Sequence, residues 1–290
     1  MEIKLELNKD VNYNANFYFE KAKKLKAKLP GIKKTIEKTK KEVENFEKEK
    51  QNYIERKEKQ KKIAKIKKNN WFDKFRWTIL SSGHLFVIGK DAGTNEVLVK
   101  KYLEDSDLIM HSEAPGSPFG IIKNVLENNE TLTINKDILE EAAGFLLVFS
   151  SQWKRGFGAS DAFWVKKEQI SKKTESGEYM TKGSFMIRGD KNILKNIPLQ
   201  ICLGVKKEKI EISDVDKNDK SQEKEFIEYE ELFSGSCKAV KKLCEKGKVV
   251  KLEPGQLKYK ALNKNIKKIL KTHIEDLPKY IPNECKILKK

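Results

Sequence analysis

The chain has 290 residues and 38% hydrophobic content, enough for one or two domains with a packed core, so it is not a disordered tail. Its 61 Lys and Arg against 43 Asp and Glu give a formal charge of +18, which favours a polyanionic partner. An apolar run of about 18 residues and a signal-peptide pattern are both missing from the sequence, so a cytoplasmic protein with no membrane partner is expected.

The four cysteines stand at positions 202, 237, 244 and 285. This sparse spacing predicts buried structural thiols and not a disulfide framework. Cys237 and Cys244 have six residues between them, more than the about two to four of a zinc knuckle. No metal and no cofactor are therefore expected.

The first seventy residues are predicted to form a basic coiled-coil region. A short alternating strand signal (Ile3, Leu5, Leu7) precedes a Lys- and Glu-rich helical segment from Asn14 to Ile66. Its one break is Pro30-Gly31, and beyond it residues at coiled-coil spacing form an imperfect seam: Ile32, Ile36, Thr39, Val43, Phe46, Lys50 and Tyr53. We expect an antiparallel helical hairpin that turns at Pro30-Gly31; a single kinked helix is the alternative.

This region also carries much of the positive charge. Residues 1–70 contain 22 basic and 11 acidic side chains, with dense lysine runs at 21–28 and 57–68. A solvated helix face and direct contact with phosphates are both open interpretations of these runs.

From Trp71 onward, aromatic and β-branched residues with glycines indicate a globular domain over residues 71–213. Strands are predicted at 75–80 and 85–88, joined by a hairpin at 81–83, and then at 107–111, 119–123, 163–165, 184–187 and 199–205. Helices are predicted at 95–103, with Val97, Leu98, Tyr102 and Leu103 buried, and at 137–150. Mixed order with short connections indicates an α+β fold.

A charged linker at 214–225 precedes a C-terminal α/β extension, residues 226–290. The extension is predicted to form a helix near 239–244, a strand at 249–252 and a helix at 262–272. It could pack on the main domain or stand apart.

The most informative stretch begins at Gly89. Lys90, Asp91 and Asn95 gather at a helix N-terminus, a position that favours an anion, while Lys100 and Lys101 lie at the far end of that helix. Asp91 or Asn95 could instead only cap the helix. Neither common nucleotide-binding fingerprint occurs.

His111 ends a predicted strand beside a Gly- and Pro-rich loop, where a ligand-contacting residue could sit. A triad of Ser117, His111 and Asp91 has no support beyond spacing, because the sequence carries no nucleophile-elbow or metal signature.

Basic and aromatic residues alternate again in two later segments, 153–164 and 179–189. Aromatic rings stack on bases and cations neutralise phosphates, so the mixture suits RNA. Trp153, Trp164, Phe185 and Ile187 are expected in the core, which leaves the lysines, Arg155 and Arg188 as exposed chemistry.

Several of these blocks resemble, in order and spacing, the RNA-binding domain of the NFACT family of ribosome-associated quality-control proteins. They begin at Trp71 (WFDKFRW), Gly89 (GKDA), Leu98 (LVKKY), His111, Ile121 (IIKN) and Gly177 (GEYMTKGSFMIRG). Residues 5–24 resemble the entry to the family's middle coiled coil, and residues 237–252 resemble the end of its archaeal-type members.

The resemblance implies a non-enzymatic RNA-binding protein that engages the large ribosomal subunit and contacts ribosomal RNA or tRNA. The family's N-terminal half is expected to be missing here, so a separate polypeptide like that half is an expected partner, and tailing of nascent chains by this chain alone is not expected. The expected RNA-binding residues are Lys90, Asp91, Asn95, Lys100, Lys101, His111, Lys123, Arg155, Lys182, Ser184 and Arg188. The alternatives are a coiled-coil scaffold that recruits proteins, and an RNA-processing enzyme built on His111.

Overall fold

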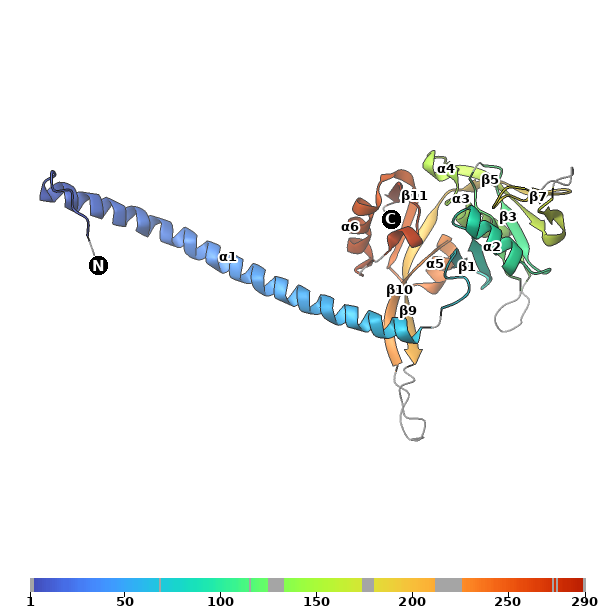
Figure 1. Cartoon of the computed structure of the whole chain (residues 1–290), viewed down its shortest axis with the longest axis horizontal. Coiled ribbons are helices and arrows are strands. Elements are labelled where there is room, and N and C mark those ends of the chain that lie inside the picture. The colour runs from blue at the N-terminus through green and yellow to red at the C-terminus, as the bar shows by residue number, and fades with distance from the viewer. Residues whose placement is uncertain are drawn as a thin grey trace, which may run out of the picture. The chain divides into compact units, whose positions relative to one another are not determined.

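The structure is a computed structural model that describes residues 3–67, 69–114, 116–124, 133–173, 180–211, 226–272, 274 and 276–288. The chain divides into two compact units, residues 1–67 and 68–290 (Figure 1). The linker predicted at 214–225 lies outside the described residues.

The first unit is a single helix, α1 (Val11–Ile66), so the predicted hairpin is wrong. Asp10 caps α1 by accepting a hydrogen bond from the Tyr13 amide, and Pro30 lies inside the helix. Gly31 does not adopt the positive φ that a tight reversal would use. The good helix formers on both sides of Pro30 outweigh the loss of one backbone hydrogen bond.

The predicted strand at Ile3 to Leu7 is also not formed. These residues run beside the first turns of α1, where the Tyr18 hydroxyl donates to the Lys4 carbonyl at 2.7 Å. The Asn14 side chain accepts from the Glu6 amide at 2.9 Å. Hydrogen bonds to α1 therefore replace those that a strand would need from a neighbour.

The second unit is built on an antiparallel six-stranded sheet with the order β1-β2-β4-β3-β5-β8. Its strands are β1 (Arg76–Ile79), β2 (Leu85–Ile88), β3 (Leu108–His111), β4 (Gly120–Ile122), β5 (Ala159–Lys166) and β8 (Asn192–Pro198). A separate two-stranded sheet pairs β6 (Ile170–Ser171) with β7 (Met186–Ile187). The predicted hairpin at residues 81–83 is confirmed by the pairing of β1 with β2.

Both faces of the six-stranded sheet are covered. Phe86 and Met110 pack on α3 (Lys136–Leu147), whereas their neighbours Val87 and Ile109 belong to clusters on the other face, which α2 (Ala92–Tyr102) covers. Residues that alternate along a strand point to opposite faces, so two covered faces explain the continuous apolar runs of these strands. Within α2 the buried residues are Asn95, Leu98 and Val99. Of the four positions predicted to be buried, only Leu98 is buried; Val97 is exposed, and Tyr102 and Leu103 are half-buried.

The C-terminal residues do not stand apart from the rest of the second unit. β10 (Phe226–Gly235), β11 (Val249–Leu257) and β12 (Cys285–Leu288) form a second antiparallel sheet with β9 (Ile201–Glu211), in the order β10-β9-β11-β12. One face packs on α6 (Tyr259–Leu270), which lies beside β11 in Figure 1, and shares the main core. The other face packs on α5 (Cys237–Leu243).

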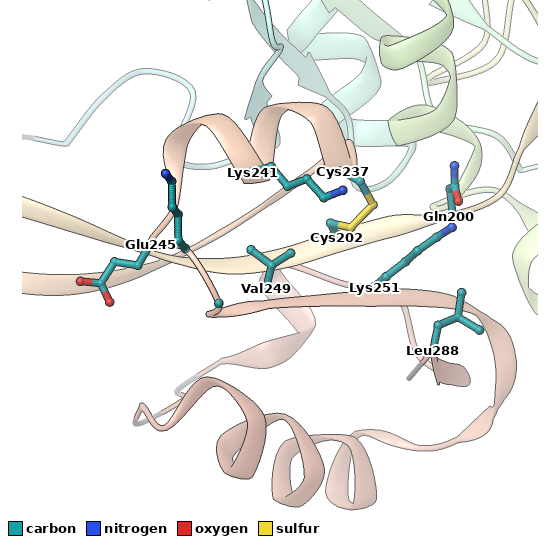
Figure 2. A pocket seen from close by; sticks show the side chains of 10 residues that line it. Gln200, Cys202, Cys237, Lys241, Glu245, Val249, Lys251 and Leu288 are labelled. Atoms are coloured by element: carbon teal, nitrogen blue, oxygen red, sulfur yellow. A yellow bond between two sulfur atoms is a disulfide. The ribbon is translucent and has the colours of Figure 1, made fainter. Parts of the chain in front are cut away.

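Two of the four cysteines form a disulfide, Cys202–Cys237, so the prediction of structural thiols is wrong for this pair. The start of α5 rests on β9 and brings the two Cα atoms to 5.0 Å, although the residues are 35 positions apart. Figure 2 shows the bridge between helix and strand. Cys244 and Cys285 are buried free thiols, and burial raises their pKa values to about 11 and about 12. Local spacing cannot reveal a bridge that the fold creates at long range.

Helix α1 buries none of its side chains, so tertiary packing contributes little to its stability. We predict that its backbone amides exchange with deuterium much faster than those of β9 when the whole chain is followed by mass spectrometry, because exchange in α1 needs only local opening. Protection of α1 equal to that of β9 would contradict this and would mean that a second molecule covers the helix.

Candidate nucleic-acid interface

A small cavity of about 280 Å³ lies at the N-terminal end of α2. Three segments meet there: the first turns of α2, the loop from β3 to β4, and the loop that leads to β7. The residues that line it are Ala92, Asn95, His111, Gly116, Ser117, Phe119, Lys182, Gly183, Ser184 and Phe185. Four predicted RNA-binding residues, Asn95, His111, Lys182 and Ser184, are therefore brought together by the fold.

The N-terminus of α2 is closed by a capping box. Asp91 accepts from the Thr94 amide at 2.8 Å, and the Thr94 hydroxyl oxygen accepts from the amides of Asp91 and Lys90. The hydrogen bond from the Thr94 amide holds the pKa of Asp91 below its ordinary value. Asp91 is therefore the cap, the structural role that the sequence left open for it, and its carboxylate occupies the position most favourable to an anion.

Asn95 joins α2 to the neighbouring loop. It is 9% exposed, and its side-chain oxygen accepts from the Phe119 amide at 3.2 Å. Gly89 also passes close by, since a Cβ built there would lie 2.0 Å from that oxygen. The Asn95 side-chain nitrogen has no hydrogen bond within the described part of the chain, so it is a donor that the cavity can offer.

His111 stands at the end of β3 with its ring stacked on Phe119, the centroids 3.9 Å apart. Its Nδ1 lies 2.8 Å from the Pro118 carbonyl oxygen, and because a carbonyl only accepts, Nδ1 carries the proton. Burial lowers the pKa of His111, against a weaker opposite effect of that hydrogen bond. The imidazole is therefore neutral near pH 7, and Nε2 is left with a lone pair.

Ser117 is a functional candidate that the sequence suggested only through an unsupported triad. It is 7% exposed, it lines the cavity, and its hydroxyl has no hydrogen-bond partner among the described residues. Buried hydroxyl groups are usually paired, so an unpaired one beside a cavity points to a missing ligand or water.

The loop that carries Lys182 and Ser184 is tied to α2 by Glu96. The Glu96 carboxylate contacts Lys100 and Lys172, each at 2.6 Å, and accepts from the Gly183 amide at 2.8 Å. Burial opposes ionisation of Glu96, but hydrogen bonds from Lys100, Lys172 and Gly183 outweigh it and lower its pKa to about 2. Lys172 also donates to the carbonyls of Thr181 and Ser184.

The contact between this loop and α2 requires a glycine at position 183. Its φ is +78°, and a Cβ built there would lie 2.5 Å from the Cα of Ala92. Lys182 also lies near the start of α2, because a Cβ built on Gly93 would lie 3.7 Å from the Lys182 Nζ atom and 3.3 Å from Oδ1 of Asp91. The sequence signal for this contact was the Lys-Gly-Ser segment itself, since a glycine marks close backbone approach.

The remaining predicted residues lie away from the cavity. Lys100 and Lys101 are in the last turn of α2, and Arg188 is exposed after β7. Lys90 is exposed before α2; partial burial and then the charges of Arg76 and Lys279 lower its pKa. Arg155 is exposed on the turn after α4 (Ser151–Lys154) and does not line the cavity.

Lys123 has a structural environment that the sequence did not reveal. It is only 9% exposed, and its Nζ atom lies 2.7 Å from Asp107 and 2.8 Å from Glu104. Asp107 is itself 1% exposed. The Lys123 ammonium group is therefore paired inside the domain, and Lys123 is not among the proposed RNA contacts.

A larger cavity of this unit, about 680 Å³, lies elsewhere, beside the disulfide. Its lining includes Val249, Lys251 and Leu288 along one wall and Lys241 on α5 (Figure 2). Its walls are mainly apolar and it holds none of the residues predicted to bind RNA. We therefore place the candidate site at the smaller cavity, where unpaired polar groups converge.

Comparison with known proteins identifies the domain that contains this cavity. Residues 74–189 match a family model described as the NFACT protein RNA binding domain, and the smaller cavity lies wholly within them. This part of the second unit is thus an NFACT RNA-binding domain. The chain is similar to proteins of the NFACT family.

Two relatives illustrate the similarity. The chain is 37% identical over 235 residues to the archaeal Rqc2 homolog aRqcH of Methanocaldococcus jannaschii, which covers 80% of this chain and 31% of that protein. It is 40% identical over 132 residues to the ribosome quality control complex subunit NEMF of Mus musculus, covering 46% and 12%. The chain thus spans about a third or less of the length of these relatives.

A weaker likeness exists to a solved structure, the C-terminal part of the fibronectin/fibrinogen-binding protein from Streptococcus suis. Its TM-score is 0.35 at 18% identity, and the match covers 46% of this chain and 47% of that one.

In the part of the chain that the structure describes, no helix is both long and apolar enough to cross a membrane.

We predict that Lys123→Ala lowers the free energy of unfolding by about 3 kcal/mol, because it leaves the Asp107 carboxylate buried without its cation. The loss is at the low end of the usual range, since Asp107 keeps hydrogen bonds from the Glu104 and Asn124 amides. Urea unfolding measures the change. Lys101→Ala is the control, expected within about 0.5 kcal/mol of the parent chain; equal losses would show that the buried pair adds nothing.

Proposed function

We propose that this chain is a non-enzymatic, cytoplasmic RNA-binding protein of ribosome quality control that associates with the large ribosomal subunit through ribosomal RNA or tRNA. The observation that carries the proposal is the match of residues 74–189 to the NFACT RNA-binding domain, together with the polar cavity inside them. The names of both relatives refer to ribosome quality control or to an Rqc2 homolog, which supports the same context.

The proposed contact surface combines the cavity with the cations around it. Asn95, His111 and Ser184 would contact the RNA within the cavity, while Lys182, Lys100, Lys101, Arg188 and Lys90 would approach the phosphates. Such contacts are long-range and salt-dependent, which fits a chain with a charge of +18. We propose that residues 71–213 form the domain that carries this activity.

The state of His111 supports a binding role over a catalytic one. A catalytic imidazole is normally oriented by a carboxylate, whereas Nδ1 of His111 is held by the Pro118 carbonyl. Asp91, the acid of the hypothetical triad, is engaged as a helix cap. Turnover of RNA that is lost in a His111→Ala variant with unchanged binding would instead establish the enzymatic alternative.

Helix α1 favours a protein partner as well. Many large apolar side chains of α1 are at least 49% exposed, among them Phe17, Leu25, Ile32, Ile36, Val43 and Phe46. Exposed apolar side chains in a row indicate a surface that another protein covers. A separate NFACT-N-like polypeptide is our proposed partner for residues 1–70, and a scaffold role for α1 is compatible with RNA binding by the second unit.

We predict that the chain sediments with large ribosomal subunits in preference to free RNA of equal length. The reason is that a specific site adds to the electrostatic attraction that any RNA provides. Sucrose-gradient sedimentation with a titrated excess of competitor RNA measures the preference. Equal distribution between subunits and competitor would reduce the proposal to non-specific binding of polyanions.

We further predict that Ala at Lys182, Arg188, Lys100 or Lys101 weakens RNA binding and flattens the slope of log K against log salt by up to ~0.7 to 0.9 per lost contact. Lys100 should give the smallest change, because it is ion-paired with Glu96. Fluorescence anisotropy at several salt concentrations measures the slope.

The matched controls are Lys48→Ala and Lys50→Ala in α1, where Glu47 and Glu49 are neighbours and disfavour a phosphate. Both should leave the slope nearly unchanged. Loss of RNA binding in the α1 variants, with normal binding in the four domain variants, would move the site to α1.

A further inference from the structure

The cavity at the start of α2 carries little net charge, although the chain is strongly basic. Asp91 already occupies the end of the helix, and Lys182 lies across Gly93 from it, so the two charges offset each other. The other polar groups on the walls are uncharged: the amide of Asn95, the hydroxyls of Ser117 and Ser184, and the neutral imidazole of His111. Such walls suit a hydroxylated, uncharged group better than a phosphate.

His111 restricts that group further. Because Nδ1 donates to the Pro118 carbonyl, the nitrogen left for a ligand is Nε2, which in the neutral ring can accept a hydrogen bond but cannot donate one. Nε2 has no partner among the described residues. A ligand here must therefore present a donor, and a hydroxyl group qualifies where a phosphate or an ether does not.

Ser117 supplies the complementary half. Its buried hydroxyl has no partner among the described residues, and a hydroxyl can both donate and accept. One ligand hydroxyl could donate to His111 and accept from Ser117. Phe119 and Phe185, 4% and 8% exposed, add apolar surface on which the carbons of a sugar could rest.

We propose that this cavity receives one ribose of RNA and reads its 2′-hydroxyl group, so that the domain distinguishes RNA from DNA. The inference rests on the proposed RNA-binding function and names the group that the site recognises. The cavity volume of about 280 Å³ lies just below the ~300 to 1,000 Å³ of pockets that enclose drug-sized molecules. A single sugar is smaller than such a molecule, so the cavity can hold one. Lys182 at the rim is placed for the adjoining phosphate. The 2′-hydroxyl is the group by which a protein can tell RNA from DNA at a given position.

The test compares three short single strands of the same sequence: oligouridine, oligodeoxyuridine and 2′-O-methyl oligouridine. Each carries a fluorescent label and is titrated with the full chain at one salt concentration. The oligouridine should bind about tenfold more tightly than the other two, because loss of the hydroxyl leaves buried polar groups of the protein unpaired. The methylated strand keeps the oxygen but has no proton for His111, so it should behave like DNA.

The decisive variant is Ser117→Ala, which removes a hydroxyl that makes no hydrogen bond to the described chain. Its melting temperature should equal that of the parent, while its preference for oligouridine falls severalfold. Ser151→Ala is the matched control, because the Ser151 hydroxyl is also buried and unpaired but lies outside the cavity. His111→Phe keeps a flat ring on Phe119 and should abolish the preference, whereas Lys182→Ala should weaken all three strands equally.

The outcomes separate the inference from the function beneath it. Tight but equal binding of the three strands would overturn the 2′-hydroxyl inference and leave RNA binding in place. A preference for oligouridine that Ser117→Ala and His111→Phe do not change would overturn the assignment to this cavity. Failure to bind any strand would overturn the proposed function, and the inference with it.

Discussion

The contact of Glu96 with Lys172 and the Gly183 amide is the interaction on which the candidate site depends. It joins α2 to the loop at 180–185, two segments separated by more than eighty residues, and without it the cavity would lack one wall. Glu96 is half-buried, and its carboxylate is paired with two ammonium groups and one backbone amide. Because its pKa is held near 2, this closure remains charged at any physiological pH.

This closure also decides which groups are left for a ligand. Glu96 engages Lys100 and Lys172, and Asp91 engages the end of α2, so the strongest charges near the cavity are satisfied internally. Weaker groups remain unpaired, namely the Asn95 amide nitrogen, the Ser117 hydroxyl and the second nitrogen of His111, as judged from the described residues. The walls of the cavity are nearly uncharged because the charged side chains around them pair with one another. The basic composition alone would suggest a phosphate as the ligand.

Much of this arrangement could be predicted from the sequence, because local signals control it. The hairpin at residues 81–83, the helix after Asp91 and the strand that ends at His111 follow from turn residues, a cap and apolar patterning. The NFACT resemblance relied on contiguous blocks of the same kind. The α+β class followed from the order of these elements.

The rest could not be predicted because it depends on contacts between distant segments. No local pattern tells that Cys202 meets Cys237, that Lys123 is buried against Asp107, or that β9 continues into a sheet with the C-terminal strands. The hairpin at Pro30-Gly31 is wrong for another reason: this dipeptide is typical of turns, but it lies within a long run of good helix formers whose propensity outweighs it. Exposure was misjudged at Val97 for a related reason, because periodicity alone does not fix which residues of a short helix face the sheet.

Attraction of RNA and discrimination between RNA and DNA have different physical sources in this chain. Residues 1–70 hold an excess of 11 positive charges on a helix that buries nothing, so they can supply long-range attraction without a defined geometry. The cavity, nearly neutral and rigidly framed, can supply discrimination but little attraction. On the proposed function, the exposed cations around the cavity make the phosphate contacts, the net charge of residues 1–70 adds attraction at long range, and the cavity supplies selectivity. Raised salt should weaken the attraction far more than the selectivity, because screening acts on exposed charges and hardly on buried hydrogen bonds. A ratio of RNA to DNA affinity that survives high salt, while both affinities fall, is the behaviour that this division of labour requires.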